Sequence, residues 1–166
     1  AVHPGKDSGH CVWDWLPDAW MAEPKYFDKD HWHETEVFQN AHVKEEYDWV
    51  NGELDRLLRR HGYVRNGLFY QAVAPNEDTI VLFCHFGVEC VLLSHLLNIS
   101  PMQLWHGTCA APSSVTVLYT EERRSGVASF RMSSFGDVSH LYAGGREPSF
   151  AARFCEVYTR FDQRHN

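Results

Sequence analysis

A histidine stands between two apolar segments of the chain. Residues 79–84 form an almost unbroken apolar run that begins with β-branched residues, which is typical of a strand buried on both faces of a parallel sheet. His85 and Gly87 follow, and the apolar spacing over 88–97 predicts a helix. Ligands bind outside the carboxyl ends of such strands. The amide groups that open a helix favour an anion such as a phosphate. We therefore expect His85 to face an anion site.

The order of strand, histidine, glycine turn, apolar helix, proline-started turn and tryptophan resembles the second half of the histidine phosphatases. This is the phosphoglycerate mutase-like superfamily, and the resemblance covers about residues 45–141. The second catalytic histidine of the family commonly stands in an S-H-G-G-V context. Here the residues read Cys84-His85-Phe86-Gly87-Val88, so Phe86 replaces the first glycine and narrows the space beside the phosphate. The resemblance implies one α/β domain over 1–166, a three-layer α/β/α sandwich with a mostly parallel sheet.

The family chemistry is the hydrolysis of phosphomonoesters through a phosphohistidine intermediate. By resemblance, His85 binds an oxygen of a phosphorylated small molecule and stabilises the charge that spreads over the phosphate. Phe86 and Gly87 would lie beside that phosphate. Ser113 and Ser114 stand where family members often place small polar residues near the phosphate, although a simple turn explains them equally well. The chemistry needs no metal and no other cofactor.

The family's Arg-His-Gly strand is absent from the sequence. The nearest string, Arg60-His61-Gly62, ends a predicted helix. The absent part would carry the nucleophilic histidine, two arginines that grip phosphate and the acid that protonates the leaving group. We therefore expect a C-terminal two-thirds of a longer protein, whose sheet is completed beside 79–84 by a missing N-terminal segment or a second chain. The alternative is a remnant or binding module without activity.

Residues 1–40 are rich in aromatic side chains. The family places a substrate-selecting cap here, so one interpretation is a lid with Trp13 and Trp15 facing the pocket. The other is a satellite hydrophobic cluster under a long loop. His31, His33 and Glu34 lack further ligands at a usable spacing, so we expect no metal.

Local patterns predict the remaining elements. An apolar stripe over 41–61 predicts an amphipathic helix, with Gly62 as its C-terminal cap. Asn66-Gly67 predicts a small hairpin that decorates the fold. Ser100-Pro101 would start a short helix. Further expected features are antiparallel strands over 115–120 and 127–132 with a charged turn over 121–126, a structural His140, and a terminal helix over 148–161.

Composition excludes several classes of protein. The chain has 166 residues, 44% of them hydrophobic, and a net charge of −7. This acidity argues against unspecific nucleic-acid binding. Five cysteines, an odd number without a C-x-x-C pair, favour reduced thiols in the cytoplasm. We expect no signal peptide and no membrane span, because no apolar segment reaches 18 residues.

Overall fold

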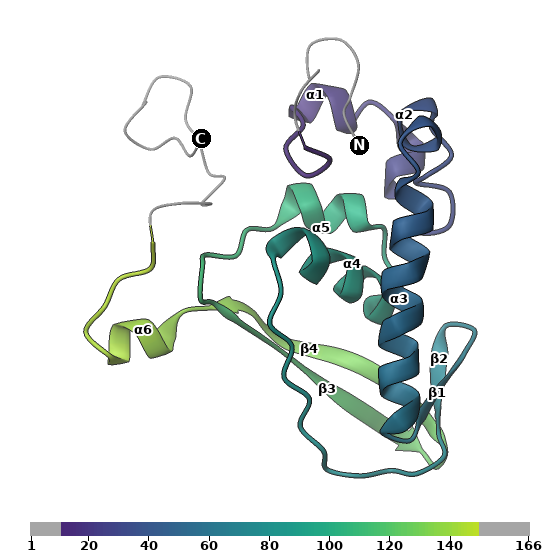
Figure 1. The fold of residues 1–166 in the computed structure, drawn as a ribbon, viewed down its shortest axis with the longest axis vertical. Coiled ribbons are helices and arrows are strands. Elements are labelled where there is room, and N and C mark those ends of the chain that lie inside the picture. Colours follow the sequence, from purple (N-terminus) through teal and green to yellow (C-terminus); the bar gives the residue numbers. More distant parts are fainter. Residues whose placement is uncertain (1–10, 150–166) are drawn as a thin grey trace.

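The computed structural model describes residues 11–149, and Figure 1 shows a helical layer above a small sheet. The helices are α1 (Pro17–Trp20), the 3₁₀ helix η2 (Pro24–Phe27), α2 (Glu36–Asn40), α3 (Val43–Arg60), α4 (Phe86–Leu97), α5 (Pro101–Gly107) and α6 (Ser139–Ala143). The strands are β1 (Tyr63–Asn66), β2 (Phe69–Ala72), β3 (Val115–Arg124) and β4 (Val127–Asp137). The predicted helix over 148–161 lies beyond the described residues from 150 onward, and the start of the predicted lid, 1–10, is also outside them.

The sheet is antiparallel throughout, so the expected sandwich with a mostly parallel sheet is wrong. Its order is β1-β2-β4-β3, and every pairing among the described strands is antiparallel. Tight turns explain the β1–β2 and β3–β4 pairings, because two-residue connections reverse the chain and place successive strands antiparallel. One such turn joins β3 to β4 at Ser125-Gly126, where Gly126 has φ +78°.

The apolar run over 79–84 is not a strand, so that prediction is also wrong. None of the four strands pairs with it, and it takes an irregular path from β2 to α4 (Figure 1). Ile80 packs against a buried cluster that includes Leu58 and Tyr70. Phe83 is 96% exposed, and Val81 and Leu82 are exposed as well. A strand needs a neighbour to take its hydrogen bonds, and the described residues provide none here.

The predicted helices are present, with small shifts at their ends. The long helix is α3, and Gly62 follows it with φ +85° in the left-handed region that favours glycine. The helix expected over 88–97 is α4, which begins two residues earlier and ends at Asn98 with φ 57°. The helix after Ser100 is α5, and the Ser100 hydroxyl accepts a hydrogen bond from the Met102 amide.

The hairpin at Asn66 is part of the sheet rather than a decoration of it. Strands β1 and β2 pair through Asn66 and Phe69, so the turn residues are Gly67 and Leu68. Strand β2 then pairs with β4. Strands β3 and β4 also extend into the predicted charged turn, leaving only 125–126 between them.

Two hydrophobic cores lie along α3. The upper core joins the aromatic segment 11–40 to α4 and α5, and the upper half of α3 packs against it. Its largest buried members are Trp15, Trp20, Tyr26, Trp32, Phe38, Met102 and Trp105. The lower core joins the second half of α3 to the sheet through Leu54, Leu58, Tyr63, Tyr70, Ala72 and Ala128. The aromatic segment is thus a main core element and not a satellite cluster.

No described helix is both long enough and apolar enough to cross a lipid bilayer.

Candidate functional site

A cavity of about 770 Å³ opens where the start of α4 meets α3 and the loop before β3. It brings together six of the seven residues that the sequence nominates. These are Trp13, His85, Phe86, Gly87, Ser113 and Ser114. They come from three segments far apart in the sequence, so the cavity is a candidate site created by the fold.

His85 is the N-cap residue of α4. Its backbone is extended, with φ −97° and ψ 158°, and its carbonyl accepts the first hydrogen bond of the helix from Glu89 N–H at 2.9 Å. The His85 side chain makes no capping hydrogen bond and is exposed. The first amides of a helix have no partner within the helix and carry its positive dipole end. His85 therefore precedes the helix end that carries the positive end of the α4 dipole.

Trp13 lies against the backbone of Gly87. A Cβ built on Gly87 would stand only 2.9 Å from the nearest ring atom of Trp13. The indole N–H of Trp105 donates to the Gly87 carbonyl at 3.1 Å from the other side. Glycine lets Trp13 approach the backbone of α4 this closely, and Trp13 forms one wall of the cavity.

The sequence left two interpretations open for Ser113 and Ser114, a place near the phosphate or a simple turn. Ser114 N–H donates to Ala111 O at 3.0 Å, which closes a turn, and both serines line the cavity. Ser113 has φ 68°, a left-handed conformation that is uncommon for a residue with a side chain. The turn therefore brings both hydroxyl-bearing residues to the cavity.

Trp15 does not line the cavity, although its neighbour Trp13 does. It is 5% exposed within the upper core. Its ring stacks on Phe38 with centroids 5.5 Å apart, and its backbone N–H donates to His106 Nε2 at 3.4 Å. Trp15 therefore holds the aromatic segment on α5 and takes no part in the cavity.

Two carboxylates that the sequence reading missed line the cavity, Glu46 from α3 and Glu89 from α4. Among the described residues, no lysine or arginine lines it. One signal for Glu46 was present in the sequence, because no lysine or arginine stands three or four residues from it on α3. The described part of the cavity is acidic, with His85 as its single imidazole.

Cys84 also lines the cavity, next to His85. Burial, with the nearby Glu89 carboxylate, raises the pKa of the Cys84 thiol. Because the thiolate is the nucleophilic form, this thiol is not activated, and the Cys84-His85 pair does not resemble a cysteine hydrolase site.

A second set of titratable groups stabilises the fold away from the cavity. Asp55 on α3 accepts a hydrogen bond from the Tyr70 hydroxyl at 2.7 Å and lies 3.0 Å from His95 Nε2. Burial alone would raise the pKa of Asp55, but hydrogen bonds from His95 and Tyr70 outweigh it and lower the pKa. Burial and the Asp55 carboxylate raise the pKa of Tyr70. This group ties α3 to β2 and α4, so its role is structural.

His106 is also structural. Its ring stacks on Trp20 with centroids 4.9 Å apart, and its Nδ1 lies 3.0 Å from Met102 O. Burial lowers the pKa of His106. Since Nε2 accepts from Trp15 N–H, the neutral ring with a proton on Nδ1 satisfies both contacts.

The region around His31 does not form a metal centre in the described chain. His31 Nδ1 lies 2.7 Å from Glu34 Oε1, but no group of three or more potential ligands occurs among residues 11–149.

Comparisons with protein-family models, curated proteins and solved structures find no match to this chain.

Proposed function

We propose that this chain is part of a phosphomonoester hydrolase that works through a phosphohistidine intermediate, with His85 as the second histidine. The observation that supports the proposal is the cavity. Its lining includes His85, Gly87, Ser113 and Ser114, and His85 precedes the first turn of α4. The antiparallel sheet gives the proposal no support, so it depends on this local arrangement and on the motif around His85.

In the proposed mechanism, His85 acts on the phosphate and not as the nucleophile. Its imidazole N–H donates to one equatorial oxygen, and amides at the start of α4 donate to others. These donors are most valuable as the transferring phosphoryl group passes through its transition state. The nucleophilic histidine, the arginines and the acid are supplied from outside the described residues.

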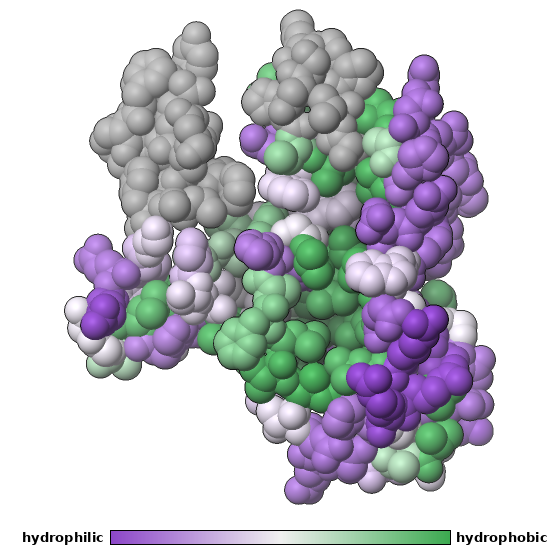
Figure 2. All heavy atoms as spheres, in the orientation of Figure 1, coloured by the Kyte–Doolittle hydropathy of each residue, from purple (hydrophilic) through white to green (hydrophobic). Residues whose placement is uncertain are grey.

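We propose further that another segment or a second chain pairs with residues 79–84. Figure 2 shows hydrophobic side chains gathered over the middle of the face where this segment runs. The exposed members of the run are Val81, Leu82 and Phe83. Unpaired backbone beside apolar side chains is a template for strand addition. A pairing partner would cover this surface and fix the position of His85.

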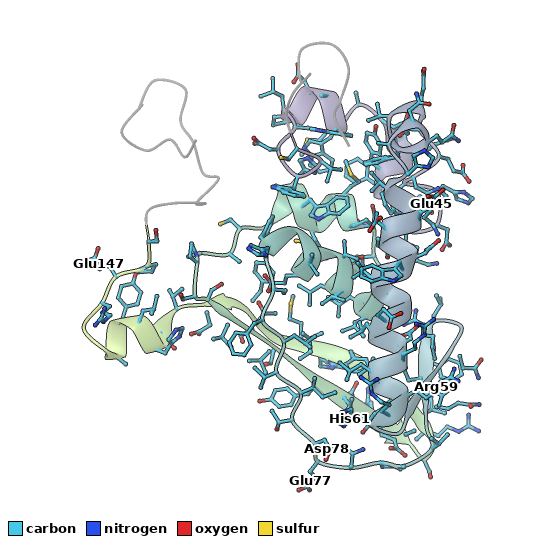
Figure 3. All side chains as sticks on the ribbon, in the orientation of Figure 1. Glu45, Arg59, His61, Glu77, Asp78 and Glu147 are labelled. Atoms are coloured by element: carbon cyan, nitrogen blue, oxygen red, sulfur yellow. The ribbon has the colours of Figure 1, made fainter. Side chains whose placement is uncertain are left out.

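The segment 79–84 is held at both ends, which favours this pairing. His61 Nδ1, at the end of α3, lies 2.7 Å from Asp78 Oδ2, and Figure 3 shows the two residues together at the base of the molecule. The other end continues into α4. A partner strand would therefore lose little additional chain entropy in ordering this segment.

The cytoplasm is the compartment that we propose for the protein. Cys11, Cys84 and Cys90 are free thiols, which fits a reducing environment.

Binding of inorganic phosphate tests the role of His85. We expect titration followed by NMR to shift the His85 ring signals with saturation, and His85→Ala to weaken binding about tenfold, as loss of one charged hydrogen bond does. His140→Ala is the matched control, because His140 is exposed on α6, at the side of the molecule away from the helical layer (Figure 1). Equal affinities of wild type and His85→Ala would refute the proposal.

A further inference from the structure

The lining of the cavity is rich in aromatic side chains. Trp13, Tyr47, Phe86 and Trp105 all line it. The Trp105 indole N–H is already bonded to Gly87 O at 3.1 Å, and the Tyr47 hydroxyl lies 3.0 Å from Ser94 Oγ. The polar atoms of Trp105 and Tyr47 are thus engaged within the protein. Trp13 is the more exposed of the two tryptophans in the lining, at 36%.

The apolar character continues around the aromatic rings. Aliphatic side chains fill the spaces between them, namely Val12, Val43, Val50 and Val91. A volume of about 770 Å³ exceeds what a phosphate group alone would fill. The cavity therefore has room for an organic group with an apolar body.

Glu46 differs from every other acidic residue on α3. Glu45 pairs with His42, Asp48 with Lys44 and Glu53 with Arg56, and Asp55 accepts from Tyr70. Within the described chain, Glu46 has no such partner, and it lines the cavity.

Glu89 lines the same cavity from the first turn of α4. With Glu46 it gives two carboxylates and, from the described residues, no lysine or arginine. Two carboxylates would repel an anionic ligand unless the ligand also carries positive charge. Aromatic faces attract an ammonium group for a related reason, because the ring quadrupole is negative at the face.

We propose that the cavity recognises a protonated amine on an aromatic or apolar skeleton. The substrate would then be a zwitterionic phosphomonoester, with its phosphate at His85 and its ammonium group between Glu46 and Glu89 and the aromatic wall. The phosphate part of this inference depends on the proposed function. The amine part depends only on the cavity wall.

Equilibrium binding to the full chain tests the amine separately from the phosphate. The probes are tyramine O-phosphate, 4-ethylphenyl phosphate, which lacks the amine, and tyramine, which lacks the phosphate. We expect tyramine O-phosphate to bind about tenfold more tightly than 4-ethylphenyl phosphate, the gain of one good charged contact. Salt should reduce this preference.

Substitutions assign the preference to particular carboxylates. Glu46→Gln and Glu89→Gln should each reduce the preference for the amine several-fold, since both keep the shape of the side chain and remove its charge. Glu45→Gln is the matched control, because Glu45 is the neighbour of Glu46 and pairs with His42 outside the cavity. Unchanged circular dichroism and urea midpoints establish that each variant is folded.

The outcomes distinguish the two proposals. Tight tyramine binding that depends on Glu46 and Glu89, with no gain from phosphate, would support the amine pocket and refute the phosphatase. Equal binding of the two phosphates, weakened by His85→Ala, would support the phosphatase and overturn the amine pocket. Failure of both amines to bind would also overturn it, as would a preference that Glu45→Gln removes as strongly as Glu46→Gln.

Discussion

Replacement of Gly87 by alanine tests whether Trp13 truly forms a wall of the cavity. The added Cβ would meet three atoms of the Trp13 ring at 2.9, 3.1 and 3.3 Å. Carbon atoms in favourable contact are about 3.5–4.0 Å apart, so the ring must retreat by roughly 0.6 Å. Trp13 is 36% exposed and can tilt outward. We therefore expect the clash to lower the free energy of unfolding by about 1 kcal/mol, at the low end of the values for overpacked cores.

A second effect opposes this cost. Alanine in place of glycine favours a helix by up to about 1 kcal/mol, and Gly87 lies within α4. The free energy of unfolding of Gly87→Ala should thus stay near the wild-type value. Gly52→Ala in α3 is the matched control, because a Cβ at Gly52 meets nothing within 4 Å. It should stabilise the protein by about 1 kcal/mol.

A double-mutant cycle in urea separates the two effects. In a Trp13→Ala background the clash is gone, so Gly87→Ala should become stabilising, with a coupling energy of about 1 kcal/mol between the two sites. The tryptophan fluorescence of Gly87→Ala should also change, because Trp13 moves toward solvent. An effect of Gly87→Ala that is the same with and without Trp13 would refute the packing described here.

Four further predictions follow from the described contacts. The 166 residues alone should hydrolyse p-nitrophenyl phosphate no faster than their His85→Ala variant, since the proposed mechanism assigns the nucleophile to a segment other than these residues, and clear His85-dependent turnover would contradict this. Tyr70→Phe removes the 2.7 Å hydrogen bond to Asp55 and should lower the free energy of unfolding by about 1.5 kcal/mol in urea, whereas an unchanged midpoint would exclude that bond. Because burial lowers the pKa of His106, the unfolded chain binds the proton more tightly, so stability should fall as pH drops below about 6.5. His106→Gln should reduce this fall in the urea midpoint between pH 8 and 5. Parallel profiles for the wild type and the variant would argue against a contribution from His106. If a second chain pairs with 79–84, the wild type should sediment above its 19.2 kDa monomer mass. Phe83→Lys should then return it toward that mass with little loss of stability, because Phe83 is 96% exposed; a monomeric wild type would contradict pairing with a second chain.

Local signals explain which parts of the fold the sequence could predict. The stripe of α3 and its glycine cap, the apolar spacing of α4, and the serine cap of α5 all depend on residues within a few positions of one another. Capping and amphipathic spacing act over that range. These elements were therefore predicted correctly, with errors of about two residues at their ends.

Strand pairing depends on partners distant in sequence, and there the prediction failed. The apolar run over 79–84 indicates a segment that gains by burial, but its composition does not say which strand lies beside it. In the described chain no strand pairs with it. The β3–β4 hairpin had a local turn signal and was recognised, whereas its length was underestimated because charged residues such as Glu121 and Arg131 pair across the two strands.

A sequence motif predicted part of the candidate site. The residues that only tertiary packing brings to the cavity were missed. His85, Phe86 and Gly87 are adjacent in sequence and were found together. Glu46 is exposed on α3, and it borders the cavity only because α3 packs beside α4. Trp13 and Trp15 are two residues apart and indistinguishable in type, yet one lines the cavity and the other is buried in the core.

The two cores along α3 contain different parts of the chain. Among the described residues, segment 11–40 packs in the upper core and β1 and β2 in the lower core, whereas α4 and β4 contribute to both. Segments with different core contacts exchange their amide hydrogens at different rates. The cavity borders the upper core, so a bound ligand should slow exchange most in segment 11–40 and least in β1 and β2.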